Sequence, residues 1–314
     1  MSSRKYRHRP KPPRLRGVAT LLVALTVAGC GQETPGETAA PPAGPVSVVF
    51  LAPAAETGLD AEAAAALAWL RSRNDFDTSF VQLADLANAS PSPASVLWWH
   101  HAAAGPLPSA ALAEAALETV RAHLSTGGAL MLSLLASPWV VPLGLETVGP
   151  NEVGLQPGTH WARWGPDDDR ILAGMQSYRG HPLLRPHWGT ILSTWMRPSE
   201  VYASAAWTND IWPANGKVVA IGRRYIGLDP DRRTVVEYDA SAARSGHVLA
   251  IGEGLYFADE DNPNRAHAES LAADALGYLG GHMPPAPAGS RIATHGAPAL
   301  MSGQDRGRRR RRAS

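Results

Sequence analysis

Cysteine is almost absent from this sequence, since Cys30 is the only one in 314 residues. A chain with one cysteine forms no internal disulfide and cannot build a metal site from several thiolates. It also has no thiol for nucleophilic catalysis in the region that follows residue 30. The chemistry of the folded part must therefore come from other side chains, and Cys30 needs an explanation of its own.

Long hydrophobic runs are also lacking. The apolar stretch Val18–Ala28 (VATLLVALTVA) is only roughly a dozen residues long, whereas a membrane-spanning helix needs about 20. It follows residues 1–17, which contain Lys and Arg but no acidic residue. A basic segment followed by a short apolar run is typical of a signal peptide.

Small residues precede the cysteine in Leu25-Thr26-Val27-Ala28-Gly29-Cys30. This segment resembles the lipobox of bacterial lipoproteins, with Val27 in place of the commoner Leu. The resemblance implies a signal peptide over residues 1–29 and an acylated Cys30 that anchors the chain in a lipid bilayer. The protein would then lie in the cell envelope, on the non-cytoplasmic side of a bacterial membrane. The alternative is an uncut membrane anchor in which Cys30 has no role.

Two further segments have compositions that disfavour folding. Residues 30–45 are rich in Gly, Pro, Thr and Ala and cannot bury enough surface to offset the entropy of ordering, so we predict a flexible tether. Residues 283–314 are similar, and we predict a disordered basic tail. The alternative for the tail is a contact with anionic lipid or an acidic polymer.

Positive charge is concentrated near both ends of the chain, although the formal net charge is only +1. Residues 1–17 are basic, and Arg308–Arg312 form an uninterrupted run. The middle of the chain is therefore acidic on balance. Binding to nucleic acid needs a basic face that neutralises phosphates, so we expect no nucleic-acid partner for the domain.

The remaining region, residues 46–282, begins with alternating strands and helices. Nearly continuous apolar or β-branched runs predict strands at Val46–Ala52, Thr78–Leu83, Ser95–Trp99 and Ala129–Leu134. Helix-forming residues predict helices over Glu56–Arg73 and Ala110–Leu124, the second capped by Ser109. No hairpin signal joins neighbouring strands. The pattern favours an α/β fold with an open parallel sheet and helices on both faces.

The second half is less regular and rich in Trp, Gly, Pro and His. Its predicted strands are Thr190–Trp195, Glu200–Ala206, Lys217–Gly222, Thr234–Tyr238 and His247–Gly252, followed by a helix over Asn264–Leu279. A short polar connection separates the last two strands. We therefore expect them to form an antiparallel pair at the edge of the sheet.

Several short motifs carry a family resemblance: SVLWWH, HLSTGGALMLS, GHPLL and GHVLAIGEGLYFADEDNPNRAHAESLAADALGYL. Together they resemble the class I glutamine amidotransferase-like superfamily. Within it they are most similar to trehalose-utilisation-like proteins and to a domain of unknown function found beside bacterial fructan and polysaccharide hydrolases. The resemblance covers most of residues 46–281 and implies a flavodoxin-like fold.

The resemblance also locates the position of a nucleophile. Catalytic members of that superfamily carry a cysteine after the strand that matches Ala129–Leu134, and here Ser133–Ser137 contains none. Amidotransferase chemistry of the thiol type is therefore excluded. A serine hydrolase using Ser133 or Ser137 is the alternative, but neither serine lies in a Gly-x-Ser-x-Gly elbow.

Histidines and acids supply other candidates. His100 and His101 follow a strand at the edge where such folds bind ligands, and they could bind a metal, act as acid and base, or simply pack. His181, in the GHPLL motif, could contact a ligand or stabilise a turn. Asp259 and Asp261 offer oxygen ligands that suit calcium, or they favour the N-terminus of the following helix. No other cofactor is expected.

Tryptophan is unusually common, with ten Trp against four Phe. Trp195, Trp207 and Trp212 lie in irregular segments, where they could stack on a sugar or fill the core. The leading hypothesis is a non-catalytic amidotransferase-like domain that binds a carbohydrate-related or other polar ligand, or a partner protein. The alternative is a hydrolase or sugar-modifying enzyme, which requires His100, His101, His181 and the acids at 259–262 to converge.

Overall fold

The computed structural model describes residues 44–155, 174–177, 181–183, 192–193, 202–208, 211–223, 232–239, 245–260 and 265–281. These residues all belong to the unit Ala43–Ser314. Cys30, Trp195, Asp261 and the basic tail at 283–314 lie outside the described residues. Within them, no helix is both long and apolar enough to span a bilayer.

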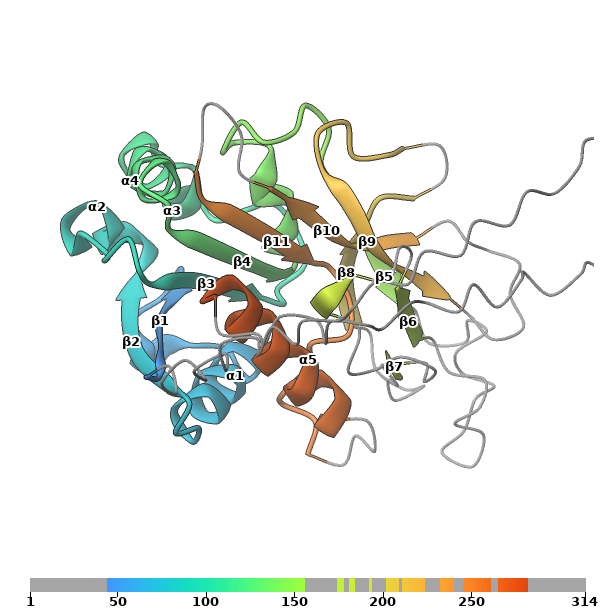
Figure 1. Ribbon diagram of the computed structural model, residues 1–314, viewed down its shortest axis with the longest axis horizontal. Coiled ribbons are helices and arrows are strands. Elements are labelled where there is room, and N and C mark those ends of the chain that lie inside the picture. Colours follow the sequence, from blue (N-terminus) through green and yellow to red (C-terminus); the bar gives the residue numbers. More distant parts are fainter. Residues whose placement is uncertain are drawn as a thin grey trace, which may run out of the picture. The chain divides into compact units, whose positions relative to one another are not determined.

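Nine strands of the described part form one sheet, in the order β2-β1-β3-β4-β11-β10-β9-β6-β7 (Figure 1). Its parallel half contains β1 (Val46–Ala52), β2 (Phe76–Gln82), β3 (Val96–His101), β4 (Ala129–Leu134) and β11 (His247–Ile251). With β11 as the fifth strand, this is the order 2-1-3-4-5 of a flavodoxin-like fold. The predicted α/β class and the flavodoxin-like sheet are therefore confirmed.

The other half of the sheet is antiparallel. It contains β10 (Arg232–Tyr238), β9 (Lys217–Arg223), β6 (Gly174–Ser177) and β7 (Leu192–Ser193), while β5 (Asn151–Leu155) pairs with β8 (Tyr202–Ala206) in a separate sheet. The predicted pairing of the last two strands is correct, but its place at the edge is wrong. β11 lies inside the sheet because β4 pairs with its other side. Its residues Val248–Ile251 are buried, as an interior strand requires.

Helices fill the connections: η1 (Glu56–Gly58), α1 (Ala61–Arg71), η2 (Leu83–Asp85), α2 (Leu86–Ala89), α3 (Ser109–Leu112), α4 (Glu114–Ser125), η3 (Ser137–Val140) and α5 (Arg265–Leu279). α1 begins later than predicted because Asp60 caps it, accepting a 2.8 Å hydrogen bond from the backbone N–H of Ala63. The prediction of one helix over Ala110–Leu124 is wrong, since Ala113 is extended and separates α3 from α4. Ser109 lies within α3 and does not cap it.

The helices cover both faces of the sheet, α1 and α5 on one and α2, α3 and α4 on the other (Figure 1). Successive residues of a strand face opposite sides. Trp98 therefore packs in the core beneath α1 and α5, and Trp99 packs in the core beneath α2, α3 and α4. The same alternation decides where the two histidines that follow them point.

Candidate functional site

Three polar side chains, those of Ser133, His100 and Glu62, form a hydrogen-bonded series at the carboxyl ends of the parallel strands. His100 on β3 is paired in register with Ser133 on β4. The Nδ1 of His100 lies 2.7 Å from Ser133 Oγ, and its Nε2 lies 3.3 Å from an Oε1 of Glu62 on α1. The indole N–H of Trp98 also donates to Ser133 Oγ, at 2.9 Å. These bonds join two neighbouring strands to the first helix.

Glu62 connects this hydrogen-bonded series to the segment that follows β11. Its carboxylate accepts hydrogen bonds from the backbone N–H groups of Phe257 and Ala258. Burial opposes ionisation of this carboxyl, but the hydrogen bond and charge of His100 and the two N–H groups outweigh it and lower the pKa of Glu62. Glu62 is therefore ionised at neutral pH.

The turn after β4 has the backbone of a nucleophile position but not the side chain. Leu134 has a φ of +56°, which is rare for a side chain of this size, and the residue is fully buried. The backbone N–H of Ala136 donates to the carbonyl of Ser133 and closes the turn, and that of Leu135 donates to the carbonyl of His101 at the end of β3. In hydrolases with a nucleophile elbow, the reactive side chain occupies such a strained strand-to-turn position. A leucine there supplies no nucleophile.

Ser133, His100 and Glu62 are linked in the sequence hydroxyl, imidazole, carboxylate, and a serine-hydrolase triad contains the same three groups in the same sequence. However, Ser133 and His100 are both completely buried, and the serine hydroxyl already bonds His100 and Trp98. A substrate cannot reach this oxygen in the observed conformation. The arrangement therefore acts as an internal hydrogen-bond network.

His101 lies on the opposite face of the sheet from His100. Its ring stacks on Trp99, with 5.5 Å between ring centroids, and the residue is buried. Burial lowers the pKa of His101, an effect that Asp60 partly opposes, so the imidazole is neutral at pH 7. The two adjacent histidines therefore do not form one metal or acid–base pair.

His181 lies elsewhere in the fold. Its Nε2 lies 3.1 Å from Oε2 of Glu237 on β10. Three strand steps of about 4.8 Å separate β3 from β10, a distance of about 14 Å. Asp259 follows Ala258 and so lies at the Glu62 end, far from His181. The convergence that the enzyme hypothesis requires is therefore not observed for His181.

The two described candidate tryptophans have different environments. Trp207 is 1% exposed and donates its indole N–H to the carbonyl of Val148 at 3.3 Å, so it packs in the core. Trp212 is 49% exposed, and the guanidinium of Arg233 lies 3.8 Å from the centroid of its ring. Of these two, only Trp212 presents an aromatic ring to solvent.

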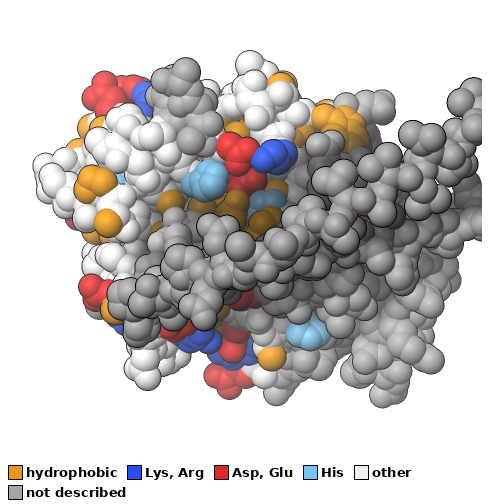
Figure 2. Space-filling view, viewed as in Figure 1, with side chains coloured by type: hydrophobic (Ala, Val, Ile, Leu, Met, Phe, Trp, Pro, Cys, Tyr) orange, Lys and Arg blue, Asp and Glu red, His pale blue; other side chains and the backbone are white. Residues whose placement is uncertain are grey.

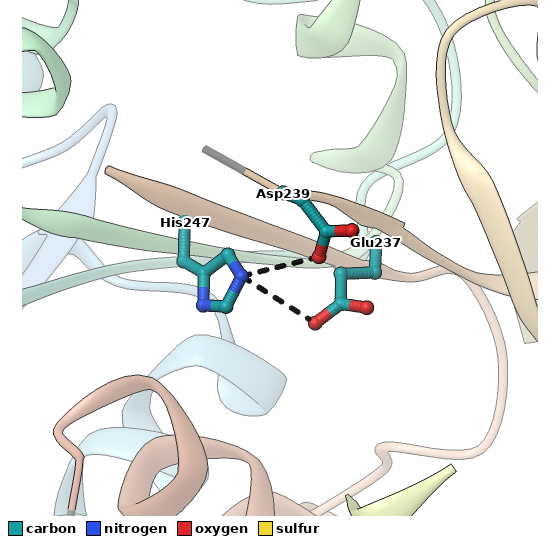
Figure 3. Close-up of side chains that lie close together, drawn as sticks. All are labelled: Glu237, Asp239 and His247. Atoms are coloured by element: carbon teal, nitrogen blue, oxygen red, sulfur yellow. Dashed lines mark hydrogen bonds and ion pairs between the residues drawn. The ribbon is translucent and has the colours of Figure 1, made fainter. Parts of the chain in front are cut away.

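A second polar cluster was not expected from the sequence, which placed Glu237 and His247 in predicted strands and gave no role to Asp239. Glu237, Asp239 and His247 each place one ligand-type atom within 4.8 Å of the others (Figure 3). Acidic, basic and histidine side chains also gather in a small part of the face shown in Figure 2. One sequence signal could have indicated this cluster: two acids spaced i, i+2 end one strand, and a histidine begins its antiparallel neighbour.

No protein-family model and no curated protein matches the chain. Solved structures resemble it at low identity. A cytoplasmic protein from Salmonella typhimurium is 13% identical, over 74% of this chain and 98% of that one, with a TM-score of 0.44. A ThuA-like protein from Bacteroides uniformis is 12% identical over 75% and 92%, and PurLQS from Thermotoga maritima is 13% identical over 76% and 100%, both with a TM-score of 0.41. Similarity at this level shows nothing about function. The flavodoxin-like fold follows from the order of the parallel strands.

Proposed function

We propose that this protein is a bacterial lipoprotein held in the cell envelope by an acylated Cys30. Its flavodoxin-like domain, which we assign to a non-catalytic branch of the amidotransferase-like superfamily, binds a carbohydrate-related or other polar ligand. The basic and apolar segments before Cys30 support the anchor, and the motifs of the folded region support the superfamily.

One observation carries the non-catalytic part of the proposal, namely the leucine at position 134. The backbone there has the strained positive φ that displays a nucleophile in elbow-type hydrolases, yet the side chain is an inert, buried leucine. The adjacent Ser133 points into the core toward His100. In the part of this edge that the structure describes, the strained strand-to-turn backbone is thus present, but Leu134 and the buried Ser133 offer no accessible nucleophile.

The ligand-binding part of the proposal rests on Trp212. Among the described residues, the exposed large hydrophobic side chains are Leu112, Val141, Val148 and Trp212, so Trp212 is the aromatic one. The Arg233 guanidinium stacks on it and holds the ring in one orientation. A fixed, half-exposed indole beside a cation suits a flat ligand that has both apolar faces and hydroxyl groups, such as a sugar.

The anchor is tested in the full chain, expressed in a bacterial host and labelled with radioactive palmitate. We expect label on the wild-type protein and its recovery with membranes. The variant Cys30→Ser should lose the label and leave the membrane fraction. Equal labelling of both chains would show that Cys30 is not the acylation site.

The ligand is tested by calorimetric titration of the detergent-solubilised mature protein with trehalose, fructo-oligosaccharides and glucose polymers. We expect Trp212→Ala to weaken binding about tenfold, the loss of roughly one stacking contact. Trp212→Phe should restore part of the affinity because it keeps a ring. Leu112→Ala is the matched control, since Leu112 is 47% exposed on α3. An unchanged affinity in Trp212→Ala would show that the ligand does not bind at Trp212.

The alternative function is a hydrolase using Ser133, His100 and Glu62, and their hydrogen-bonded order favours it. A fluorophosphonate probe distinguishes the two because it labels activated serines. Covalent labelling of the wild type that is lost in Ser133→Ala would establish the hydrolase and contradict the non-catalytic proposal. We expect no labelling at this serine.

A further inference from the structure

Three ligand-type side chains meet where β10 and β11 pair, near the amino ends of the parallel strands (Figure 3). The antiparallel register pairs Tyr238 with Val248, which places Asp239 opposite His247 and Glu237 diagonal to it. Alternation along the two strands puts all three side chains on the face covered by α5. The fold therefore brings together residues that lie up to ten positions apart in sequence.

The separations between these atoms suit a small metal ion. His247 Nε2 lies 3.2 Å from Asp239 Oδ1 and 3.7 Å from Glu237 Oε1. A tetrahedral zinc ion bound at about 2.0–2.1 Å holds its nitrogen and oxygen ligands about 3.3 Å apart. Calcium and magnesium prefer oxygen ligands throughout. An imidazole nitrogen beside two carboxylates therefore favours zinc or a related transition metal.

Neighbouring side chains hold Glu237 in place. The phenol of Tyr278, near the end of α5, donates to Oε1 of Glu237 at 2.5 Å, and His181 lies against Oε2. Glu237 is 1% exposed. Its two carboxylate oxygens therefore each have a fixed neighbour in the buried interior. Such outer contacts fix a ligand's orientation and keep the carboxylate ready to bind.

In the observed structure the ammonium group of Lys217 pairs with the carboxylates of Glu237 and Asp239. Lys217 is paired with Glu237 across β9 and β10, and its Nζ lies 2.5 Å from Asp239 Oδ2 and 3.7 Å from Glu237 Oε2. Its side chain is 51% exposed, so the ammonium can turn toward solvent when another cation enters. A divalent ion would then replace it without leaving either carboxylate unpaired. Lys217 is thus expected to compete with the metal.

We propose that Glu237, Asp239 and His247 bind one divalent transition-metal ion, with zinc as the best match and water as the fourth ligand. This site lies at the opposite edge of the sheet from Ser133 and His100, so it is independent of the carboxyl-edge network. Three protein ligands with one open position are the arrangement of zinc sites that bind and polarise a small ligand.

The test uses the full chain, treated with chelator and titrated calorimetrically with zinc chloride, calcium chloride and magnesium chloride in turn. We expect one high-affinity zinc site per chain and no comparable calcium or magnesium site. Asp239→Asn and His247→Ala should each weaken zinc binding by at least about tenfold. Lys217→Met should tighten it, because the competing ammonium is removed. Cobalt(II) absorption spectra of the same proteins report the geometry directly.

The matched control is His267→Ala, which removes an exposed histidine of α5 that lies outside the cluster. Its zinc affinity should equal that of the wild type. Asp239→Asn keeps the shape of an exposed side chain, so it separates ligand loss from misfolding. Zinc binding that is absent, or equally strong in Asp239→Asn and the wild type, would overturn the proposal. A weaker, not tighter, site in Lys217→Met would also contradict it.

Discussion

The hydroxyl of Ser133 lies 2.7 Å from Nδ1 of His100 across two parallel strands, and neither residue has any exposed surface. The same oxygen accepts the indole N–H of Trp98. Two buried polar groups, the His100 imidazole and the Trp98 indole, therefore depend on one hydroxyl. Such a network stabilises the fold only while every member has a partner.

Removing this hydroxyl should cost stability without affecting surface chemistry. Ser133→Ala leaves the Trp98 indole N–H without its partner and lowers the free energy of unfolding by about 1–3 kcal/mol. Urea denaturation followed by circular dichroism measures the change. Ser125→Ala, at the exposed end of α4, removes a hydroxyl that bonds only a nearby carbonyl and should change stability by less than about 0.5 kcal/mol. Equal effects of the two substitutions would contradict the role of the network.

Glu237 should make the fold sensitive to acid. Its pKa is lowered from 4.5 to about 2 in the folded protein, so its contribution is present above about pH 4.5 and is lost as the pH falls toward 2. The full effect is about 3 kcal/mol at most. Urea titrations at pH 7, 4 and 3 should show a steeper loss for the wild type than for Glu237→Gln. Glu114→Gln, at an exposed position of α4, should keep the wild-type dependence on pH.

Glu146 should hold the turn before β9 closed. Its buried carboxylate accepts the backbone N–H groups of Ala214, Asn215 and Gly216 at 2.8–3.0 Å. Glu146→Gln removes the charge and should lower the free energy of unfolding by about 1–3 kcal/mol. Hydrogen exchange should be faster at residues 214–216.

The control for Glu146 is Glu152→Gln, because Glu152 is exposed and accepts only one backbone bond, from Gly105. Its exchange rates at residues 214–216 should match those of the wild type. Unchanged exchange in Glu146→Gln would show that the turn closes without the carboxylate.

A glycine should relieve backbone strain after α2. Ser90 is exposed and has a φ of +41°, in the left-handed region that glycine adopts at no steric cost. Ser90→Gly should therefore raise the free energy of unfolding by about 1 kcal/mol. Ala68→Gly, on the exposed side of α1, should have the opposite effect of similar size, because glycine weakens a helix interior. A melting temperature that falls in both variants would contradict the strain at Ser90.

Local sequence was sufficient for the first four parallel strands, β1 to β4. The predicted strands Val46–Ala52 and Ala129–Leu134 coincide with β1 and β4. Continuous apolar runs of strand length have few alternatives in an α/β domain, because both faces must be covered. The missing cysteine at the end of β4 was equally plain from the sequence.

The break between α3 and α4 could not be predicted from the local sequence. Nothing in Ala110–Leu124 is a glycine or proline, and the apolar spacing continues through Ala113. The carbonyl of Ala111, which a continuous helix would use internally, accepts instead the indole N–H of Trp139 at 2.7 Å. A tertiary hydrogen bond from η3 therefore replaces a helical one.

The sequence by itself determined that this domain has no thiol chemistry and that its first half alternates buried strands with helices, because composition and periodicity act locally. Only the tertiary structure decided that His181 lies with Glu237 and away from His100, and that Glu237, Asp239 and His247 share one face. Those outcomes depend on strand order and register. β11 is inserted between β4 and β10 because both of its edges and both of its faces are satisfied there, a condition that no local pattern expresses.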